Sequence, residues 1–306
     1  MMAVLELKNL EKSFGKLEVI RDLSFAVEEN SVFGFIGKNG AGKTTTMKMI
    51  LGFLQPDAGE IYVNGERVAY GNTKTNRHIG YLPDVPEFYG YMSPKEYLRL
   101  CGEITGLSRE VTQDRSKELL SMVGLENTNR RIRGFSRGMK QRLGIAQALL
   151  NEPRLLICDE PTSALDPIGR KEILDILSIA RERTTIVFST HILSDVERIA
   201  DSIGVINDGK LILEGPVQEI KNMKRKDTIK LVLSNHEMAN ELMSRINELT
   251  FVLEVVLEKE GILIKLTNAE EFGKEILSLL VREDIPVLRY EILEPSLENV
   301  FLEVVG

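Results

Sequence analysis

The segment GKNGAGKTT, Gly37 to Thr45, constrains the fold of this 306-residue chain more than any other. It follows a short apolar run at 31–36, which predicts a buried strand, and it precedes a helical pattern at 47–51. Glycines let backbone N–H groups converge on one point, and a helix N-terminus adds partial positive charge. The segment fits the pattern G-x-x-x-x-G-K-[ST], which predicts a cradle for the phosphates of a nucleotide.

Composition limits the classes of protein to which the chain can belong. With 43% hydrophobic and 28% charged residues it is ordinary globular material, and its length suggests about two domains. A net charge of −7 argues against wrapping nucleic acid, so we expect no nucleic-acid partner. Cys101 and Cys158 have no metal-binding spacing and are expected to be reduced packing residues. No apolar run approaches the roughly 20 residues of a membrane span, so we expect a soluble chain whose membrane role comes through a partner.

The order of predicted elements indicates an α/β fold. Short strands and turns, including an Asn64-Gly65 hairpin, occupy residues 1–70, and a helical stretch from about 93 to 150 opens with an N-cap pattern at Ser93. Alternating strands and helices then predict a parallel sheet covered by helices. The predicted strands are 155–158, 185–188 and 203–206, and the predicted helices start at Pro167 and near Ser194.

A basic and polar segment, Lys221 to Lys226, indicates a boundary between domains at 1–222 and 227–306. The second domain is expected to be a small α+β domain whose βαββαβ order is that of the ferredoxin-like fold. Its predicted strands are 227–233, 250–256, 261–267 and 285–292, with helices at 236–248, at 269–282 and from about Ser296.

Two carboxylates end an apolar strand within RLLICDEPTSALD, residues 154–166. In parallel sheets ligands sit at the carboxyl edge, so Asp159 is expected to hold Mg²⁺ and Glu160 to activate the attacking water. The alternative is an acidic strand end that faces solvent.

A second small-residue turn, GFSRGMKQR at 134–142, opens a helix predicted at Met139–Leu150 and makes another anion site. The alternative is a simple cap by Ser136. Because one nucleotide has one γ-phosphate, a second anion site suggests a second molecule. His191 ends the strand in IVFSTH, where it can contact a γ-phosphate or be structural.

Together these motifs resemble the nucleotide-binding subunit of an ATP-binding cassette (ABC) transporter, over roughly residues 1–220. The resemblance implies a P-loop NTPase fold of the ABC type, with a mixed sheet and a helical subdomain at about 90–150. It also implies ATP hydrolysis with Mg²⁺, a homodimer in the ATP-bound state with Asp166 at its seam, and a separate integral-membrane permease. The subunit would then be cytoplasmic and peripheral on the inner face of the cell membrane.

The resemblance also implies a role for each matching residue. Lys43, Glu160 and His191 would be catalytic, and Thr44 and Asp159 would bind the metal. Phe14 sits where the family stacks an aromatic ring on adenine, although an ordinary core phenylalanine is the alternative. The residues expected to contact the nucleotide are Phe14, Gly37, Lys38, Asn39, Gly40, Ala41, Gly42, Lys43, Thr44 and Thr45, with Ser136 and Gly138 reaching the ATP of the other subunit.

Three departures from the family pattern stand out. The signature reads Phe-Ser-Arg-Gly-Met where Leu-Ser-Gly-Gly-Gln is usual, so Arg137 replaces a glycine. Asp84 stands in place of a glutamine, and we expect it to reach the metal. Phe14 lacks the phenol of the more usual tyrosine. The variant signature and the tail Leu293–Leu302 resemble ATPases of ABC-2 exporters of drugs and antibiotics.

Two other functions lack the sequence patterns that they would require. An ABC-type ATPase acting on DNA would need a long heptad insertion, and one acting on ribosomes would carry two cassettes; neither pattern is present. A small P-loop GTPase would carry the guanine-reading Asn-Lys-x-Asp, which is absent, and a kinase would not explain the signature.

Overall fold

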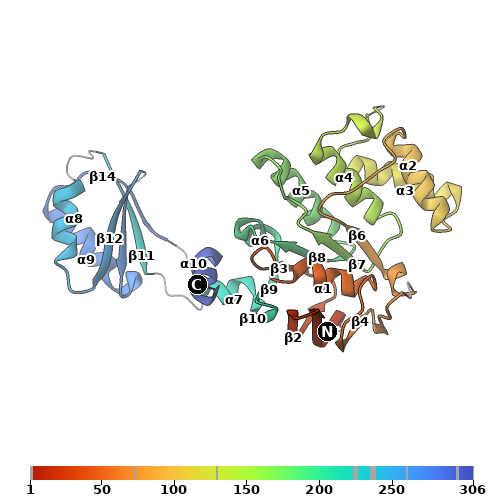
Figure 1. The fold of residues 1–306 in the computed structure, drawn as a ribbon. Helices are drawn as coiled ribbons and strands as arrows, with labels where there is room; N and C mark the ends of the chain where they lie inside the picture. Colours follow the sequence, from red (N-terminus) through yellow and green to blue (C-terminus); the bar gives the residue numbers. More distant parts are fainter. Residues whose placement is uncertain are drawn as a thin grey trace. The chain divides into compact units, whose positions relative to one another are not determined.

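The structure, a computed structural model, describes residues 3–71, 74–128, 130–222, 227–234, 239–259, 261–293 and 296–305. Its contacts divide the chain into a first unit that runs through Val217 and a second unit, Gln218–Val304 (Figure 1). This division falls after the first residue of helix α7 (Val217–Asn222), a few residues earlier than the expected boundary. Residues 223–226 of the expected basic linker lie outside the described residues.

The first unit contains two sheets. The larger has the strand order β10-β9-β3-β8-β7-β6, in which β10 alone runs antiparallel to its neighbour. The smaller, β2-β1-β4-β5, is antiparallel. The strands of the larger sheet are β3 (Val32–Ile36), β6 (Ile79–Leu82), β7 (Leu155–Asp159), β8 (Thr185–Thr190), β9 (Ser202–Asn207) and β10 (Lys210–Pro216). Those of the smaller are β1 (Ala3–Phe14), β2 (Leu17–Glu28), β4 (Ala58–Val63) and β5 (Glu66–Arg67).

Local sequence explains these strands. Every residue of β3, β7 and β8 is buried, as expected for continuous apolar runs in a parallel sheet covered on both faces. The predicted hairpin is confirmed, and β9 and β10 form a second one. Asn64 and Gly65 join β4 to β5, and Asp208 and Gly209 join β9 to β10, all four with positive φ as a two-residue hairpin turn requires.

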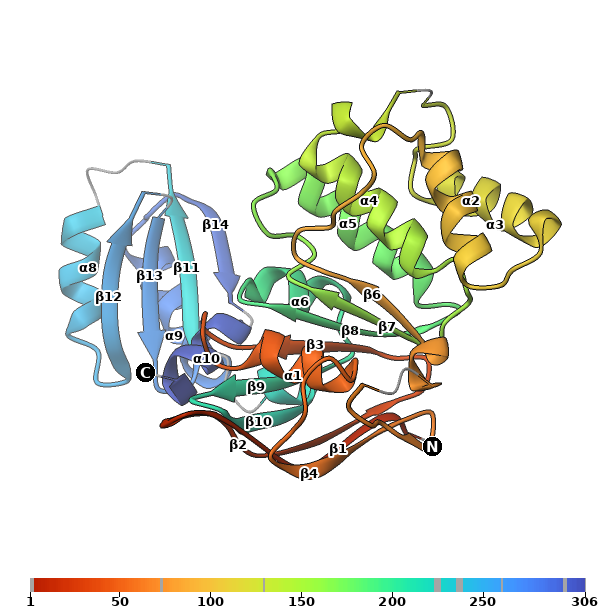
Figure 2. The ribbon, with the colours of Figure 1, turned by 45° about the vertical axis from the view of Figure 1, so that its right-hand side comes forward.

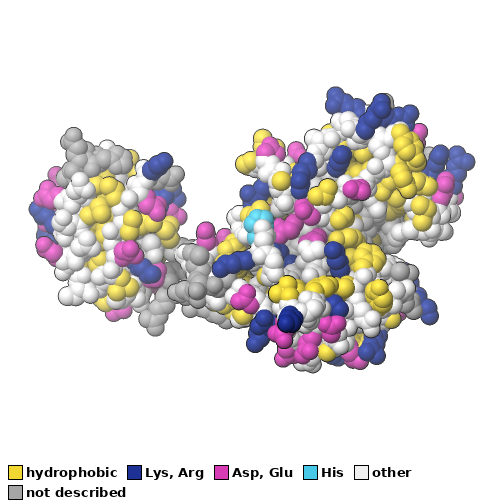
Figure 3. Space-filling model, in the orientation of Figure 1, with side chains coloured by type: hydrophobic (Ala, Val, Ile, Leu, Met, Phe, Trp, Pro, Cys, Tyr) yellow, Lys and Arg dark blue, Asp and Glu magenta, His cyan; other side chains and the backbone are white. Residues whose placement is uncertain are grey.

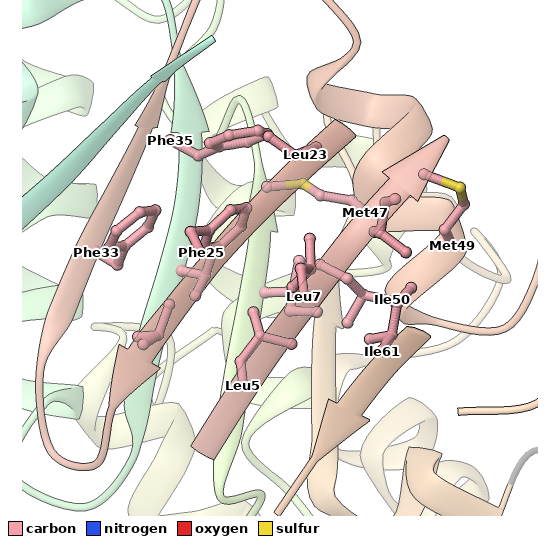
Figure 4. Close-up of a cluster of buried hydrophobic side chains, with 14 of the residues drawn as sticks. Leu5, Leu7, Leu23, Phe25, Phe33, Phe35, Met47, Met49, Ile50 and Ile61 are labelled. Atoms are coloured by element: carbon pink, nitrogen blue, oxygen red, sulfur yellow. The ribbon is translucent and has the colours of Figure 1, made fainter. Parts of the chain in front are cut away.

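The main core lies between the two sheets. Helix α1 (Lys43–Ile50) is inserted there, and its Met47, Met49 and Ile50 point toward side chains from both sheets (Figure 4). Phe25 of β2 stacks on Phe33 of β3, with ring centroids 5.1 Å apart. The start of α1, which carries the phosphate loop, is therefore anchored on two sides.

Other helices lie on the opposite face of the larger sheet: α4 (Arg137–Ala148), α5 (Pro167–Ala180) and α6 (Leu193–Ile199) (Figure 2). Helices α2 (Pro94–Ile104) and α3 (Arg109–Met122) complete the predicted helical stretch, with 3-10 turns at Lys74–His78 and Ile132–Gly134. The capping box at Ser93 and Glu96 is confirmed. Helix α4 begins two residues before the predicted start because the Ser136 side chain caps it, accepting from the Met139 N–H at 3.2 Å.

The second unit folds around its own core. Its elements follow the order βαββαβ, with the antiparallel strand order β12-β13-β11-β14 and one apolar cluster between sheet and helices. That it is a ferredoxin-like accessory domain stays a prediction. The elements are β11 (Thr228–Leu233), α8 (Ala239–Asn247), β12 (Val252–Glu258), β13 (Gly261–Leu266), α9 (Ala269–Arg282), β14 (Val287–Ile292) and a final α10 (Leu297–Val305).

Candidate functional site

The phosphate loop, residues 37–45, joins β3 to α1 and needs its glycines. Gly42 has φ of 112°, and a Cβ there would lie 2.4 Å from Cδ1 of Ile20. A Cβ on Gly37 would lie 2.6 Å from the Ile206 carbonyl oxygen. The loop therefore folds closely over the sheet, and it directs the ammonium of Lys43 back to the Gly37 carbonyl, 2.7 Å away. Lys38, Asn39 and Gly40 are exposed, whereas Ala41 and Gly42 are buried.

Glu160 lies between two groups that can carry positive charge. One carboxylate oxygen is 3.2 Å from Nζ of Lys43, and the other is 2.9 Å from Nδ1 of His191. Lys43 is 6% exposed, so its charge is poorly screened and needs this carboxylate and the loop carbonyls. The structure thus brings the three predicted catalytic residues together at the carboxyl ends of β7 and β8.

Asp159 and Thr44 form a group of hard oxygen ligands beside them. The Thr44 hydroxyl donates to Asp159 Oδ1 at 3.3 Å, and the buried Ser189 hydroxyl donates to the same oxygen at 2.6 Å. Among the described residues no cluster of three His, Cys, Asp or Glu side chains could hold a metal ion. A hydroxyl and a carboxylate next to a phosphate cradle fit Mg²⁺, which takes its remaining ligands from phosphates and water.

Burial and negative charge at this edge of the sheet also raise the pKa of Tyr81, which lies on the neighbouring strand β6. Burial first, and the Asp159 carboxylate next, raise the pKa of Tyr81 to about 12. The phenol therefore stays neutral at physiological pH and adds no charge to the site. Burial likewise raises the pKa of the Cys158 thiol, which agrees with the expected packing role.

Asp84 follows β6 and pairs with the other unusual residue of the sequence. Its carboxylate accepts from Nη2 of Arg137 at 3.1 Å, and its backbone carbonyl accepts from Nε2 of the buried Gln141 at 2.6 Å. Both bonds connect the loop after β6 to helix α4. The structure places no contact between Asp84 and Asp159 or Thr44 within the described chain, so the metal role of Asp84 stays a prediction.

Ser136 and Gly138 of the signature lie apart from this cluster, at the start of α4. Ser136 is exposed at the N-terminus of α4, and Gly138 lies one residue after Arg137 on the same turn. In the part of the chain that is described, no hydrogen bond or ion pair joins Ser136 to Lys43, Glu160 or His191. Asp166, expected at a dimer seam, caps α5 by accepting from the Gly169 N–H at 3.1 Å.

Phe14 is not a core residue. It ends β1 with 51% of its surface exposed, which excludes the alternative weighed from the sequence. The ammonium of Lys12 lies 5.6 Å from the centroid of its ring. An exposed aromatic ring remains available for stacking.

Sequence reasoning missed two parts of the site. Ser189 joins the strand ends, since its hydroxyl also accepts from the Glu160 N–H at 2.9 Å. Behind it, the buried Asp195 accepts from the Thr162 hydroxyl and from Arg170, each at 2.6 Å, and so ties the 161–166 segment to α6. The signal available for Ser189 was a polar residue directly after the apolar run 186–188. The Asp195 network depends on tertiary contacts, which local sequence does not reveal.

Comparison with known proteins gives a consistent family. A family model described as "ABC transporter" matches residues 20–163, and one described as "ATP-binding protein DrrA1-3-like, C-terminal domain" matches residues 215–305. None of the helices in the described chain is long and apolar enough to cross a membrane.

Two curated relatives match this chain over nearly their whole length. The uncharacterized ABC transporter ATP-binding protein YxlF of Bacillus subtilis is 38% identical over 303 residues, which is 99% of each chain. The bacitracin transport ATP-binding protein BcrA of Bacillus licheniformis is 37% identical over 100% of this chain and 98% of its own. A solved ATP-binding subunit of an ABC transporter superimposes with a TM-score of 0.65 and 35% identity, covering 72% of this chain and 92% of that one.

Proposed function

Because the chain belongs to the ATP-binding proteins of ABC transporters, we propose that two copies of it enclose two Mg-ATP molecules and drive a separate membrane permease. As a member of this family the chain is an ATPase. The dimer, the metal and the permease are the proposed parts of the function.

The observation that carries the proposal is the separation of two phosphate-binding features. Lys43, Glu160 and His191 form one connected cluster, whereas Ser136 is exposed at the start of another helix. A second copy would bring its own Ser136 and Gly138 onto the γ-phosphate held by the first. Each ATP site would then be complete only in the dimer.

Within one site, each side chain has a task that its position supports. With ATP bound, Lys43 would contact β- and γ-phosphate oxygens in place of its loop carbonyl. Thr44 and Asp159 would hold Mg²⁺, which would neutralise charge on the phosphates. Glu160 orients and deprotonates the attacking water. His191, next to Glu160, donates to the γ-phosphate. Phe14 stacks on the adenine ring.

The relatives support a transport role. BcrA carries a bacitracin transport name, and the C-terminal match is to a DrrA-like domain, so we assign the chain to an exporter of drugs or antibiotics. The permease would place it on the inner face of the cell membrane. The alternative of an ATPase that acts on DNA or ribosomes gains no support from these relatives.

The variant Glu160→Gln tests the dimer directly. It keeps the shape of the side chain and removes the base, so ATP should bind while hydrolysis falls by about a hundredfold or more. The variant should therefore accumulate as a dimer on size-exclusion chromatography with Mg-ATP. Glu219→Gln, an exposed change on α7, is the matched control and should keep wild-type hydrolysis. A Glu160→Gln chain that stays monomeric at saturating ATP would refute the dimer.

A further inference from the structure

A cavity outside the ATP site lies between helices α2 and α3. Its volume is about 340 Å³. Every residue that lines it is polar or charged. The lining residues of α3 follow a spacing of three and four, which places them on one side of the helix, facing α2. The lining residues are Lys95, Glu96 and Arg99 of α2 and Arg109, Thr112, Gln113, Ser116 and Lys117 of α3.

The cavity is strongly cationic in a chain whose net charge is −7. Within the described residues, no carboxylate pairs with Lys95, Arg109 or Lys117, whereas Arg99 pairs loosely with Glu103 at 3.6 Å. The one acidic lining residue, Glu96, is already engaged by Arg131 at 2.6 Å and by the Ser93 N–H at 2.7 Å. Figure 3 shows dark-blue side chains gathered at the outer end of α2 and α3.

A buried hydroxyl without a partner adds a specific donor. Ser116 is 6% exposed, and its Oγ makes no hydrogen bond with any described residue. Buried polar atoms are nearly always paired, because an unpaired one loses its hydrogen bond to water without replacement. An oxyanion inside the cavity would accept from Ser116 while its charge is met by the surrounding ammonium and guanidinium groups.

The end of the helix pair presents apolar side chains beside these cations. Ile104, the last residue of α2, is 75% exposed, and Val111 in the first turn of α3 is 46% exposed. Apolar residues next to unpaired Lys and Arg side chains are the pattern of a surface that rests on an anionic membrane. A free phosphate would use the cations and Ser116 but would leave Ile104 and Val111 without a role.

We propose that the α2–α3 pair binds the phosphate of an anionic phospholipid headgroup, with Ile104 and Val111 entering the membrane interface. The proposal rests on the proposed function, since the permease would bring the chain to the membrane. The headgroup would bridge Lys95, Arg109 and Lys117 and accept from Ser116.

Co-sedimentation of the nucleotide-free full chain with vesicles tests the proposal. The probes are phosphatidylcholine vesicles with and without phosphatidylglycerol. Binding should require phosphatidylglycerol and weaken with salt. At roughly 1 kcal/mol per cation, the triple variant Lys95→Gln/Arg109→Gln/Lys117→Gln should bind about a hundredfold more weakly. Ser116→Ala and Ile104→Ser should each weaken binding by a smaller factor.

The control is Lys210→Gln/Lys265→Gln/Lys274→Gln, which removes the same charge from exposed sites elsewhere. Equal losses in both triple variants would show that only net charge matters and would overturn the proposal. A thermal shift with inorganic phosphate, together with no binding to vesicles, would also overturn the proposal. Because the assay contains no ATP, its failure is distinguishable from failure of the proposed function, which the ATP-dependent dimerisation of Glu160→Gln reports.

Discussion

The hydroxyl of Ser189 joins the end of β7 to the end of β8. It donates to Asp159 and accepts from the backbone of Glu160, whose φ of 49° is unusual for a non-glycine residue. One side chain therefore sets the positions of the proposed metal ligand and the proposed base. At the residue scale, the geometry of this site depends on a residue to which the sequence assigned no contact with nucleotide or metal.

Replacing Ser189 by alanine should lower kcat more than it raises the KM for ATP. The misplaced carboxylates should cost about tenfold to a hundredfold in kcat, and the loss of a buried hydrogen bond about 1–3 kcal/mol in the free energy of unfolding. Steady-state kinetics and urea denaturation measure the two effects. Ser31→Ala removes a hydroxyl near the opposite end of β3 and should leave kcat unchanged. A Ser189→Ala chain with wild-type kcat would show that the hydroxyl has no positioning role.

At the scale of elements, the two unusual residues of the sequence are each other's partner. Asp84 lies near the start of the loop after β6, and Arg137 is the first residue of α4. Each is about half exposed, so their ion pair should contribute little to stability, on the order of 0–1 kcal/mol. The ion pair connects the loop that carries Asp84 to the helix whose first turn is expected to reach the partner's ATP.

The variant Asp84→Asn should make the ATPase rate depend less on Mg²⁺. A carboxylate near the γ-phosphate repels its negative charge, so nucleotide binding depends more strongly on the metal. The neutral amide of asparagine removes that repulsion. With the permease present, transport-coupled hydrolysis should fall more than nucleotide affinity. Arg137→Gln breaks the same ion pair and is the control. Superimposable Mg²⁺ titrations for wild type and Asp84→Asn would contradict a role of Asp84 in the metal site and would leave its ion pair with Arg137 as its role.

Local signals in the sequence predicted much of this arrangement. The phosphate loop, the Asn64-Gly65 hairpin and the Ser93 capping box each depend on neighbouring residues, so spacing alone reveals them. The partnership of Asp84 and Arg137 was not predicted, because 53 positions separate them and only the packing of α4 on β6 brings them together. The Asp195 network was missed for the same reason.

At the scale of the whole molecule, the chain contains two cores. The larger apolar cluster contains no residue after Leu211, and a separate cluster starts at Ile229. Every predicted site residue lies between Phe14 and His191. The ATP site and the C-terminal unit are therefore built from different parts of the chain.

Truncation after Asn222 should leave the affinity for nucleotide within about twofold of that of the full chain. The truncated chain retains the larger core and every predicted site residue. Titration with a fluorescent ATP analogue measures this, and a thermal melt shows whether the shortened chain folds. A folded truncated chain with strongly weakened binding would contradict the independence of the two cores.

The central claim is that each ATP site is shared by two copies, and mixed dimers test it most directly. Chains with Ser136→Arg and chains with Lys43→Ala should each be nearly inactive alone. A mixed dimer of the two has one site with both lesions and one site with neither. Mixing Lys43→Ala with Glu160→Gln is the control, because both residues act within one chain and each mixed site keeps a lesion.

The measurement is the ATPase rate of each mixture compared with its parents. The account predicts a clear rise for Ser136→Arg mixed with Lys43→Ala and none for the control mixture. A first mixture whose rate never exceeds that of its parents, although mixed dimers are present on size-exclusion chromatography, would contradict it.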